Sequence, residues 1–247
     1  AGAIAVDSPA ELARAVRITF SMVADAPDVE EVTLGEHGVA AGAQPGHIHI
    51  DSSTISPQAA RRIAARLAER GVRLLDAPVS GGETGAIEGT LTFMVGGDEA
   101  AFATAQPLFE AMGRTITWIG ESGAGQVAKA CNQILTGVTV VAVAEAFNLA
   151  RAEGVDPGRV RTALLGGSAY SRVLENHGAR MLARNFRPGF KSWMHQKDMR
   201  IVLDEAHLIL VPSPLSAAAS QLFNALVGAR LVEEDSIAVL KLFERLG

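Results

Sequence analysis

Hydrophobic and polar positions follow two different rhythms along the 247-residue chain, and the change comes near residue 122. Upstream, short runs rich in β-branched residues alternate with amphipathic helical stretches, several of which open with helix-start pairs such as Ser8-Pro9 and Ser56-Pro57. Strands that alternate with helices predict a parallel sheet covered on both faces. The expected strands are Ile18–Val23, His47–Asp51, Leu74–Pro78, Leu91–Val95 and Thr115–Ile119, and the expected helices are Pro9–Val16, Pro27–Gly35, Pro57–Arg70 and Asp98–Met112.

Downstream of Gly123 the apolar residues recur with the helical period and no convincing strand remains. Residues 124 to about 153 form one uninterrupted pattern, which corresponds to about 45 Å of helix at 1.5 Å per residue. The sequence therefore predicts an α/β domain over residues 1–122 and an all-α domain over residues 123–247, joined by this long helix. The further expected helices are Asp156–Leu165, Ser171–Ala183, Gly189–Leu210, Pro212–Ala229 and Glu234–Leu246.

The composition narrows the class of protein. Hydrophobic residues make up 48% and charged residues 20% of the chain, which is typical of a globular protein. The net charge of −5 and the lack of a basic block argue against a nucleic-acid partner. The single cysteine, Cys131, excludes an intrachain disulfide and favours a cytoplasmic location. The apolar run Ile134–Phe147 is too short and too polar to span a bilayer, so we expect no membrane partner.

A glycine motif, G-x-G-x-x-A, occurs at Gly123, Gly125 and Ala128, after a predicted strand and before the long helix. This pattern also marks dinucleotide-binding turns, and Glu145 even stands where an acidic residue is expected. In such turns, however, the first glycine follows the strand almost directly and a second strand follows the helix. Neither condition holds here, so a pyrophosphate site is the less favoured interpretation.

A second interpretation is that the start of the long helix binds a substrate. Lys129, Asn132 and Gln133 stand at positions i, i+3 and i+4 and therefore share one helical face, with Gly125 one turn earlier. A glycine at that position is expected to let a ligand approach the backbone. The alternative, which spacing alone leaves open, is a solvated lysine with ordinary polar neighbours.

A second glycine-rich stretch, Ser80-Gly81-Gly82, follows a predicted strand at the sheet edge where α/β proteins place ligands. Backbone N–H groups and a hydroxyl in such a turn suit a carboxylate. A tight turn that needs positive φ angles would explain the same glycines. No metal site is expected, because His177 and His195 lack further ligand residues nearby.

Together, four motifs resemble the β-hydroxyacid dehydrogenases and occur in that family's order. They are DSSTISP from Asp51, DAPVSGG through MVGG from Asp76, GAGQVAKACNQ from Gly123, and HQKD from His195. The resemblance implies a Rossmann domain, a long connecting helix and an all-α domain. It also implies NAD- or NADP-dependent interconversion of a short β-hydroxyacid and its semialdehyde, by an enzyme that forms a homodimer or homotetramer.

The resemblance assigns roles to individual residues. Lys129 matches the catalytic lysine, and Asn132 the substrate-binding asparagine, with Gln133 beside it. Within the family, the glutamine at position 133 makes the chain more similar to the 2-hydroxy-3-oxopropionate (tartronate semialdehyde) reductases. The 3-hydroxyisobutyrate dehydrogenases stay the alternative. The carboxylate-binding turn is matched by Ser80, Gly81 and Gly82, and cofactor-contacting positions by Met22, Val23, Ala24, Asp28, Thr54 and Lys197; Ala24 stands where the family usually has proline.

The family's own glycine-rich strand–turn–helix has no match in the chain. By the family's usual layout, we expect roughly 40 further residues ahead of Ala1, and they would include this glycine-rich unit. The residues that would choose between NAD and NADP lie in that part. If the protein lacked it altogether, the chain would be a non-catalytic binding or regulatory relative, and we expect an active enzyme instead.

Overall fold

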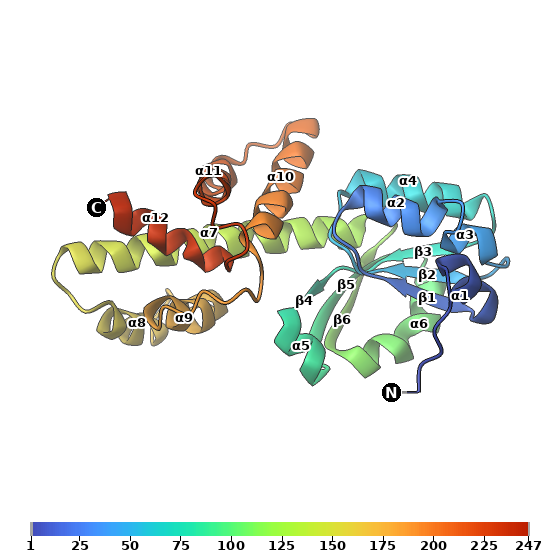
Figure 1. Ribbon diagram of the computed structural model, residues 1–247, viewed down its shortest axis with the longest axis horizontal. Coiled ribbons are helices and arrows are strands. Elements are labelled where there is room, and N and C mark those ends of the chain that lie inside the picture. The colour runs from blue at the N-terminus through green and yellow to red at the C-terminus, as the bar shows by residue number, and fades with distance from the viewer. Residues whose placement is uncertain (1, 247) are drawn as a thin grey trace. The chain divides into compact units, whose positions relative to one another are not determined.

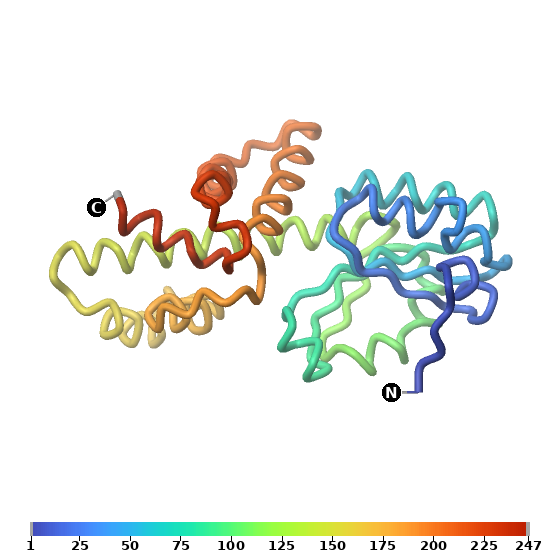
Figure 2. Tube along the Cα trace, viewed as in Figure 1, coloured from blue at the N-terminus to red at the C-terminus, as the bar shows by residue number. Residues whose placement is uncertain are grey.

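The computed structural model describes residues 2–246 and divides into two compact units, Ala1–Lys129 and Ala130–Gly247. Unit 1 contains the whole β-sheet, and unit 2 is helical (Figures 1 and 2). The predicted fold class, an α/β sheet followed by an all-α region, is confirmed. The long helix α7 (Ala124–Ala152) begins in unit 1 and continues into unit 2.

The sheet of unit 1 is mixed, whereas the alternation of elements predicted a parallel one. Strands β1 (Ile18–Ser21), β2 (Ile48–Asp51) and β3 (Arg73–Asp76) are parallel, but β5 (Leu91–Gly97) runs antiparallel to β3. The reason lies between β3 and β5, where a short strand and a short helix replace the long crossover helix that a parallel connection needs. These two elements are β4 (Val79–Ser80) and α5 (Gly82–Glu88); the last strand, β6 (Gly113–Gly120), pairs in parallel with β5.

Helices cover both faces of this sheet, as expected (Figure 1). On one face, α2 (Ala26–Leu34) and α4 (Pro57–Ala68) enclose a core around Ile63 and Leu67. On the other, α6 (Glu99–Met112) packs Phe109 against Phe93, with 4.9 Å between the ring centroids. The shorter α1 (Pro9–Ala15) and α3 (Val39–Gly42) pack together beside β1.

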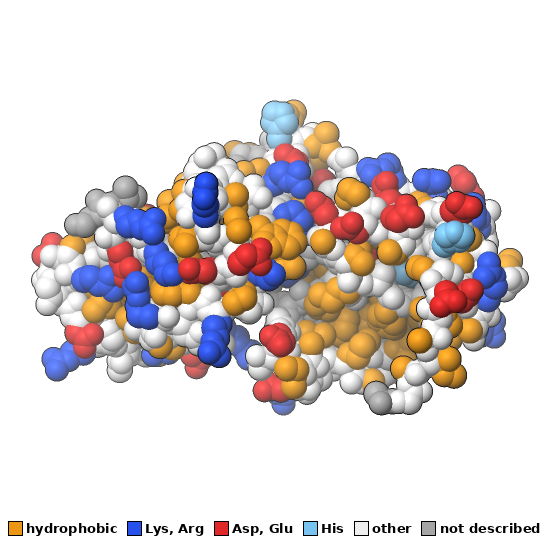
Figure 3. Space-filling view, in the orientation of Figure 1, with side chains coloured by type: hydrophobic (Ala, Val, Ile, Leu, Met, Phe, Trp, Pro, Cys, Tyr) orange, Lys and Arg blue, Asp and Glu red, His pale blue; other side chains and the backbone are white. Residues whose placement is uncertain are grey.

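Strand β1 pairs only with β2 and forms one edge of the sheet. Figure 3 shows one face of unit 1, on which hydrophobic side chains gather in a hollow. The part-exposed Phe20 and Leu108 contribute to the apolar surface of this unit. Unit 1 therefore combines two well-packed layers with a sheet edge that carries apolar surface.

Unit 2 is built around α7, whose Val140, Ala144 and Phe147 are completely buried. By length and composition alone α7 could cross a membrane, because the helix is longer than the apolar run seen in the sequence. Its buried residues instead belong to the core of unit 2, which explains the apolar character. The other helices of the unit are α8 (Pro157–Leu165), a π-helical turn (Val173–His177), α9 (Gly178–Leu182), α10 (Ser192–Leu208), α11 (Pro214–Gly228), a 3-10 turn (Ser236–Ala238) and α12 (Val239–Leu246).

Candidate active site

Two loops meet at the carboxyl ends of β1 and β2. The Ser53 hydroxyl accepts a hydrogen bond from the Val23 backbone N–H (2.8 Å) and donates one to the Asp51 carboxylate (2.7 Å). This single serine therefore ties the Met22–Ala24 segment to the loop that carries Thr54. Met22 is 69% exposed at this edge. The structure thus brings together four of the residues predicted to contact the cofactor: Met22, Val23, Ala24 and Thr54.

This edge fits a nucleotide cofactor. α/β proteins bind nucleotides beyond the carboxyl ends of parallel strands. Here Met22 offers an exposed apolar surface for a ring, and Thr54 lies on the neighbouring loop. Asp28, also predicted to contact the cofactor, has a local role in the structure. Its carboxylate accepts from the Asp25 N–H (3.1 Å) and completes the capping box of α2.

Asp76, at the end of β3, caps the long helix. Its carboxylate is completely buried and accepts hydrogen bonds from the backbone N–H groups of Gly123 (2.7 Å) and Gln126 (3.0 Å). A carboxylate is well placed there, because the first turn of a helix carries unpaired N–H groups and the positive end of its dipole. Burial nevertheless raises the pKa of Asp76 to about 6; the two N–H groups oppose this rise and the nearby Asp51 adds to it.

The glycines of the G-x-G-x-x-A motif make this cap possible. A Cβ on Gly125 would lie 2.3 Å from the Asp76 carbonyl oxygen and 2.5 Å from that of Met94. One on Gly96 would lie 2.6 Å from the Gly125 nitrogen. The expectation that Gly125 leaves room for a ligand is therefore wrong, because the sheet itself fills that space. Two of the N–H groups that might have held a phosphate are already bound to Asp76.

Gln126 joins the same helix start to the loop after β2. It is 1% exposed; its Nε2 donates to the Ser53 carbonyl (2.8 Å) and its Oε1 accepts from the Ile55 N–H (3.2 Å). Sequence reasoning did not select Gln126 or Asp76. The available hint was a polar residue within an apolar pattern, at the end of a strand for Asp76 and in the first turn of a helix for Gln126.

Lys129 lies one turn further along α7 and is 9% exposed. Its ammonium Nζ donates a hydrogen bond to the Val79 carbonyl oxygen (2.8 Å), so the structure places it beside Ser80. The predicted Ser80–Gly82 turn is the start of α5, with φ angles of +133° at Gly81 and +62° at Gly82. Both glycines occupy the left-handed region that side chains disfavour.

Unit 2 brings three more predicted residues together. The Asn132 Nδ2 donates to the Gln133 Oε1 (2.7 Å), and the Gln133 Nε2 donates to the Asp198 carboxylate (2.6 Å). Lys197 lies 3.0 Å from the other carboxylate oxygen of Asp198. Asp198 belongs to the HQKD motif but was not selected as a site residue, although it links Asn132 and Gln133 on α7 to Lys197 on α10.

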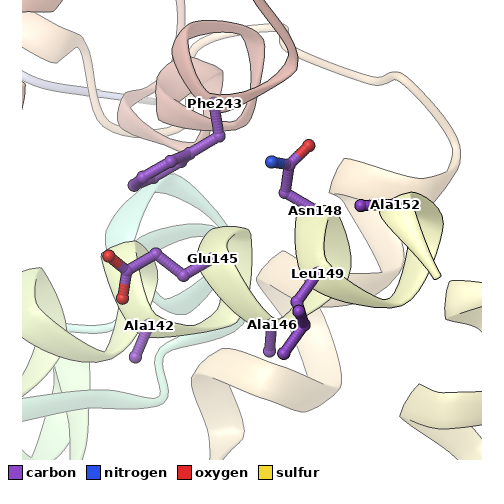
Figure 4. Close-up of a pocket in the computed structure, with 7 residues that line it drawn as sticks. All are labelled: Ala142, Glu145, Ala146, Asn148, Leu149, Ala152 and Phe243. Atoms are coloured by element: carbon purple, nitrogen blue, oxygen red, sulfur yellow. The ribbon is translucent and has the colours of Figure 1, made fainter. Parts of the chain in front are cut away.

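An open groove of about 500 Å³ lies elsewhere in unit 2, between α7 and α12. Figure 4 shows Glu145 and Asn148 of α7 along it, with Phe243 of α12 opposite. None of the predicted site residues lines this groove. Glu145 lies here midway along the helix and not at the end of a strand, where a ribose-binding acid would be needed.

Comparisons with known proteins agree with the four sequence motifs. Residues 1–120 match the NAD-binding domain of 6-phosphogluconate dehydrogenase, and residues 123–243 match the NAD-binding domain of NADP-dependent 3-hydroxyisobutyrate dehydrogenase. The chain is 45% identical over 243 residues to 2-hydroxy-3-oxopropionate reductase of Escherichia coli K12, covering 98% of this chain and 83% of that protein.

Two further proteins are similar to the chain over most of its length. NAD-dependent L-serine dehydrogenase of Pseudomonas aeruginosa is 38% identical, with 99% of this chain and 84% of that protein covered. The crystal structure of a 3-hydroxyisobutyrate dehydrogenase from Salmonella typhimurium superimposes with a TM-score of 0.87 at 33% identity, covering 95% of this chain and 82% of that one. The motifs, the fold and these relatives show that the chain belongs to the β-hydroxyacid dehydrogenase family of NAD(P)-dependent oxidoreductases.

Proposed function

We propose that the protein reduces 2-hydroxy-3-oxopropionate to glycerate, and catalyses the reverse oxidation, with Lys129 as general acid and base. The observation that carries this proposal is the placement of the Lys129 ammonium, nearly buried and 2.8 Å from the Val79 carbonyl oxygen, beside the Ser80–Gly82 segment. A fixed cation next to a possible carboxylate-binding segment suits a substrate that carries a carboxylate and a reacting carbonyl.

The chemistry needs a hydride and a proton. A nicotinamide cofactor, when bound, would provide the hydride that the aldehyde carbon needs. Lys129 stabilises the charge that develops on the aldehyde oxygen and donates its Nζ proton to it, which gives the alcohol. The lysine then regains a proton from solvent. In the oxidative direction the neutral amine takes the hydroxyl proton.

The remaining residues would hold the reactants. Ser80, Gly81 and Gly82 would bind the substrate carboxylate through the hydroxyl and backbone N–H groups. Asn132, three residues after Lys129 on α7, would bind the substrate with Gln133 beside it. The cofactor would be held by Met22, Val23, Ala24, Thr54 and Lys197, with Asp28 at the start of α2.

The relatives bear on the choice of substrate. Their names describe β-hydroxyacids or semialdehydes that share a three-carbon main chain and differ at C2, the carbon beside the reacting one. This carbon carries a hydroxyl in 2-hydroxy-3-oxopropionate, an ammonium in L-serine and a methyl in 3-hydroxyisobutyrate. The 45% identity and Gln133 favour the hydroxyl compound. A 3-hydroxyisobutyrate dehydrogenase is the second candidate, supported by the match over residues 123–243.

Initial-rate measurements test this proposal directly. Reduction of 2-hydroxy-3-oxopropionate would be followed with NADH and with NADPH, and oxidation of glycerate and 3-hydroxyisobutyrate with the oxidised cofactors. We expect the highest kcat/KM for the hydroxyl pair. Turnover of 3-hydroxyisobutyrate alone would select the second candidate, and no turnover of any compound would contradict the proposal.

We also propose that the protein forms a homo-oligomer. Leu135 and Leu149 of α7 are 70% and 66% exposed, and their spacing of fourteen residues places them on one helical face. Exposed apolar side chains on a shared face favour burial against another surface. Sedimentation of the wild type and of Leu149→Glu tests this, since the charge would dissociate an oligomer that buries the face.

A further inference from the structure

The hydrogen bonds between Asn132 and Lys197 have a fixed direction. An ionised carboxylate can only accept, and an ammonium can only donate. The Lys197 ammonium lies 3.0 Å from the Asp198 carboxylate and forms an ion pair with it. Gln133 must therefore turn its Nε2 to Asp198 (2.6 Å) and its Oε1 to Asn132. Asn132 must in turn donate through Nδ2 (2.7 Å).

The orientation of the Asn132 carboxamide follows from this order. With Nδ2 bound to Gln133, its carbonyl oxygen Oδ1 faces away from this chain of bonds, and no donor within residues 2–246 contacts it. Asn132 is half-buried, and its Oδ1 is not one of the fully buried side-chain atoms that lack a partner. Hydrogen bonds in a chain polarise one another, which makes the Oδ1 a stronger acceptor. An isolated carboxamide would have no such preference, because its two ends are almost the same size.

We propose that Asp198 is a positioning residue that sets substrate choice by keeping Asn132 Oδ1 as a hydrogen-bond acceptor. The inference rests on the proposed function, in which Lys129 and Asn132 bind the same substrate. The acceptor pairs with a donor on the carbon beside the reacting carbon, namely a hydroxyl or an ammonium. A methyl group there removes water from Oδ1 without replacing the hydrogen bond, which is unfavourable for a desolvated polar atom.

Asp198→Asn is expected to reverse the whole chain of bonds. Lys197 would hold the new side-chain oxygen, so the new amide N–H₂ would face Gln133. Gln133 and then Asn132 would each turn round, and Asn132 would offer N–H₂ to the ligand. A hydroxyl can accept as well as donate and can adapt to this change, whereas an ammonium can only donate. The variant should therefore discriminate most strongly against the ammonium compound.

The test compares three ligands that differ only at C2: glycerate, L-serine and 3-hydroxyisobutyrate. Each is measured as a substrate, or as a competitive inhibitor where turnover is slow. For the wild type we expect glycerate and serine to be favoured over 3-hydroxyisobutyrate. In Asp198→Asn, kcat/KM or binding for serine should fall at least about tenfold more than for glycerate, and 3-hydroxyisobutyrate should change least.

Two further variants keep the test decisive. Gln133→Met interrupts the chain of bonds but leaves the Lys197–Asp198 pair, so it should weaken the preference for both donor ligands if Asp198→Asn does not fold. Asp204→Asn removes an exposed carboxylate from the same helix and should leave the order of the ligands unchanged.

The inference would be overturned if Asp198→Asn lowered kcat/KM or binding equally for all three ligands. It would also be overturned if neither Asp198→Asn nor Gln133→Met changed the order of the ligands. The wild type would still turn over glycerate in either case. Absence of turnover in the wild type would instead overturn the proposed function. The two failures are therefore distinguishable in one set of measurements.

Discussion

Asp76 in unit 1 and Asp198 in unit 2 are both buried carboxylates, but different kinds of donor hold them. Asp76 accepts two backbone N–H groups of α7, whereas Asp198 is held by the side chains of Gln133 and Lys197. Backbone donors are rigid, so the contact with Asp76 fixes the position of a helix. Side-chain donors can turn, so the contact with Asp198 fixes an orientation. Asp76 thus fixes a position within unit 1, and Asp198 fixes an orientation within unit 2.

Asp76 and Asp198 also differ in the charges that surround them. Lys197 gives Asp198 a full positive charge as a partner, while Asp76 has only the partial charges of a helix start. Burial therefore raises the pKa of Asp76 to about 6. The charge of Asp76, the buried carboxylate that positions the helix, therefore depends on pH near this value.

The largest expected effect concerns the residue that the Asp76 contact positions. Replacing Lys129 by methionine removes the proton donor, and we expect kcat to fall by about 10²- to 10⁴-fold. The affinity for the cofactor, followed by fluorescence titration, should stay nearly unchanged. Lys191→Met, which removes a part-exposed lysine paired with Glu233, is the control. Near-normal turnover in the Lys129 variant would contradict the role of Lys129 as general acid and base. The Asp76 contact would then not position a catalytic residue.

The next effect is the pH dependence that Asp76 contributes to the free energy of unfolding. Its pKa is about 6 in the folded protein against an ordinary value of 3.8. Between these values the folded state binds the proton more tightly, so the Asp76 contribution to the free energy of unfolding falls as the pH rises, and levels off above about pH 6. Asp76→Asn lacks this contribution. The wild type should therefore lose about 3 kcal/mol relative to the variant between about pH 4 and pH 7.

Urea unfolding at several pH values measures this difference. Trp118 reports on unit 1 when Trp193, the other tryptophan, is replaced by phenylalanine. Asp98→Asn, which removes the exposed cap of α6, controls for the loss of a capping carboxylate. Parallel curves for wild type and Asp76→Asn would show that the buried carboxylate does not titrate in this range.

A smaller effect is expected from the close approach of α7 to the sheet. In Gly125→Ala the new methyl group would lie 2.3 Å from a backbone oxygen, which cannot move aside as a side chain could. Such overpacking typically destabilises by about 1–3 kcal/mol. Gly228→Ala has no atom within 4 Å of the new methyl and should be neutral or stabilising by up to about 1 kcal/mol. Equal stability of the two variants would disprove the close contact.

The smallest effect is expected for an exposed carboxylate, Glu30, which serves as a contrast to the buried Asp76. Glu30 pairs with Arg62 at 2.8 Å, but the two side chains are 41% and 61% exposed. Exposed pairs of this kind contribute about 0–1 kcal/mol. Glu30→Gln should therefore change the unfolding free energy of unit 1 by less than 1 kcal/mol at any pH. A larger change would mean that burial is not what distinguishes Asp76.

The sequence predicted most elements, because periodicity is a local property, and its motif spacing selected the residues proposed for the site. It could not predict that Asp76 occupies the space beside Gly125, since those residues meet only through the sheet. The same limit applied to Asp198, whose contact with Gln133 joins residues 65 positions apart. The short helix after Ser80 was missed because two glycines at its start indicate a turn more strongly than a helix.

The first turn of α7 also has a consequence for how the chain folds. Its polar partners lie 47 to 73 residues earlier, in β3 and in the loop after β2. Contacts across such separations form late, because the ends of a long loop must meet before any bond is gained. We therefore expect native-state hydrogen exchange to show the amides of Gly123 and Gln126 protected only as strongly as the sheet. Lys129 would then acquire its position in one of the last steps of folding.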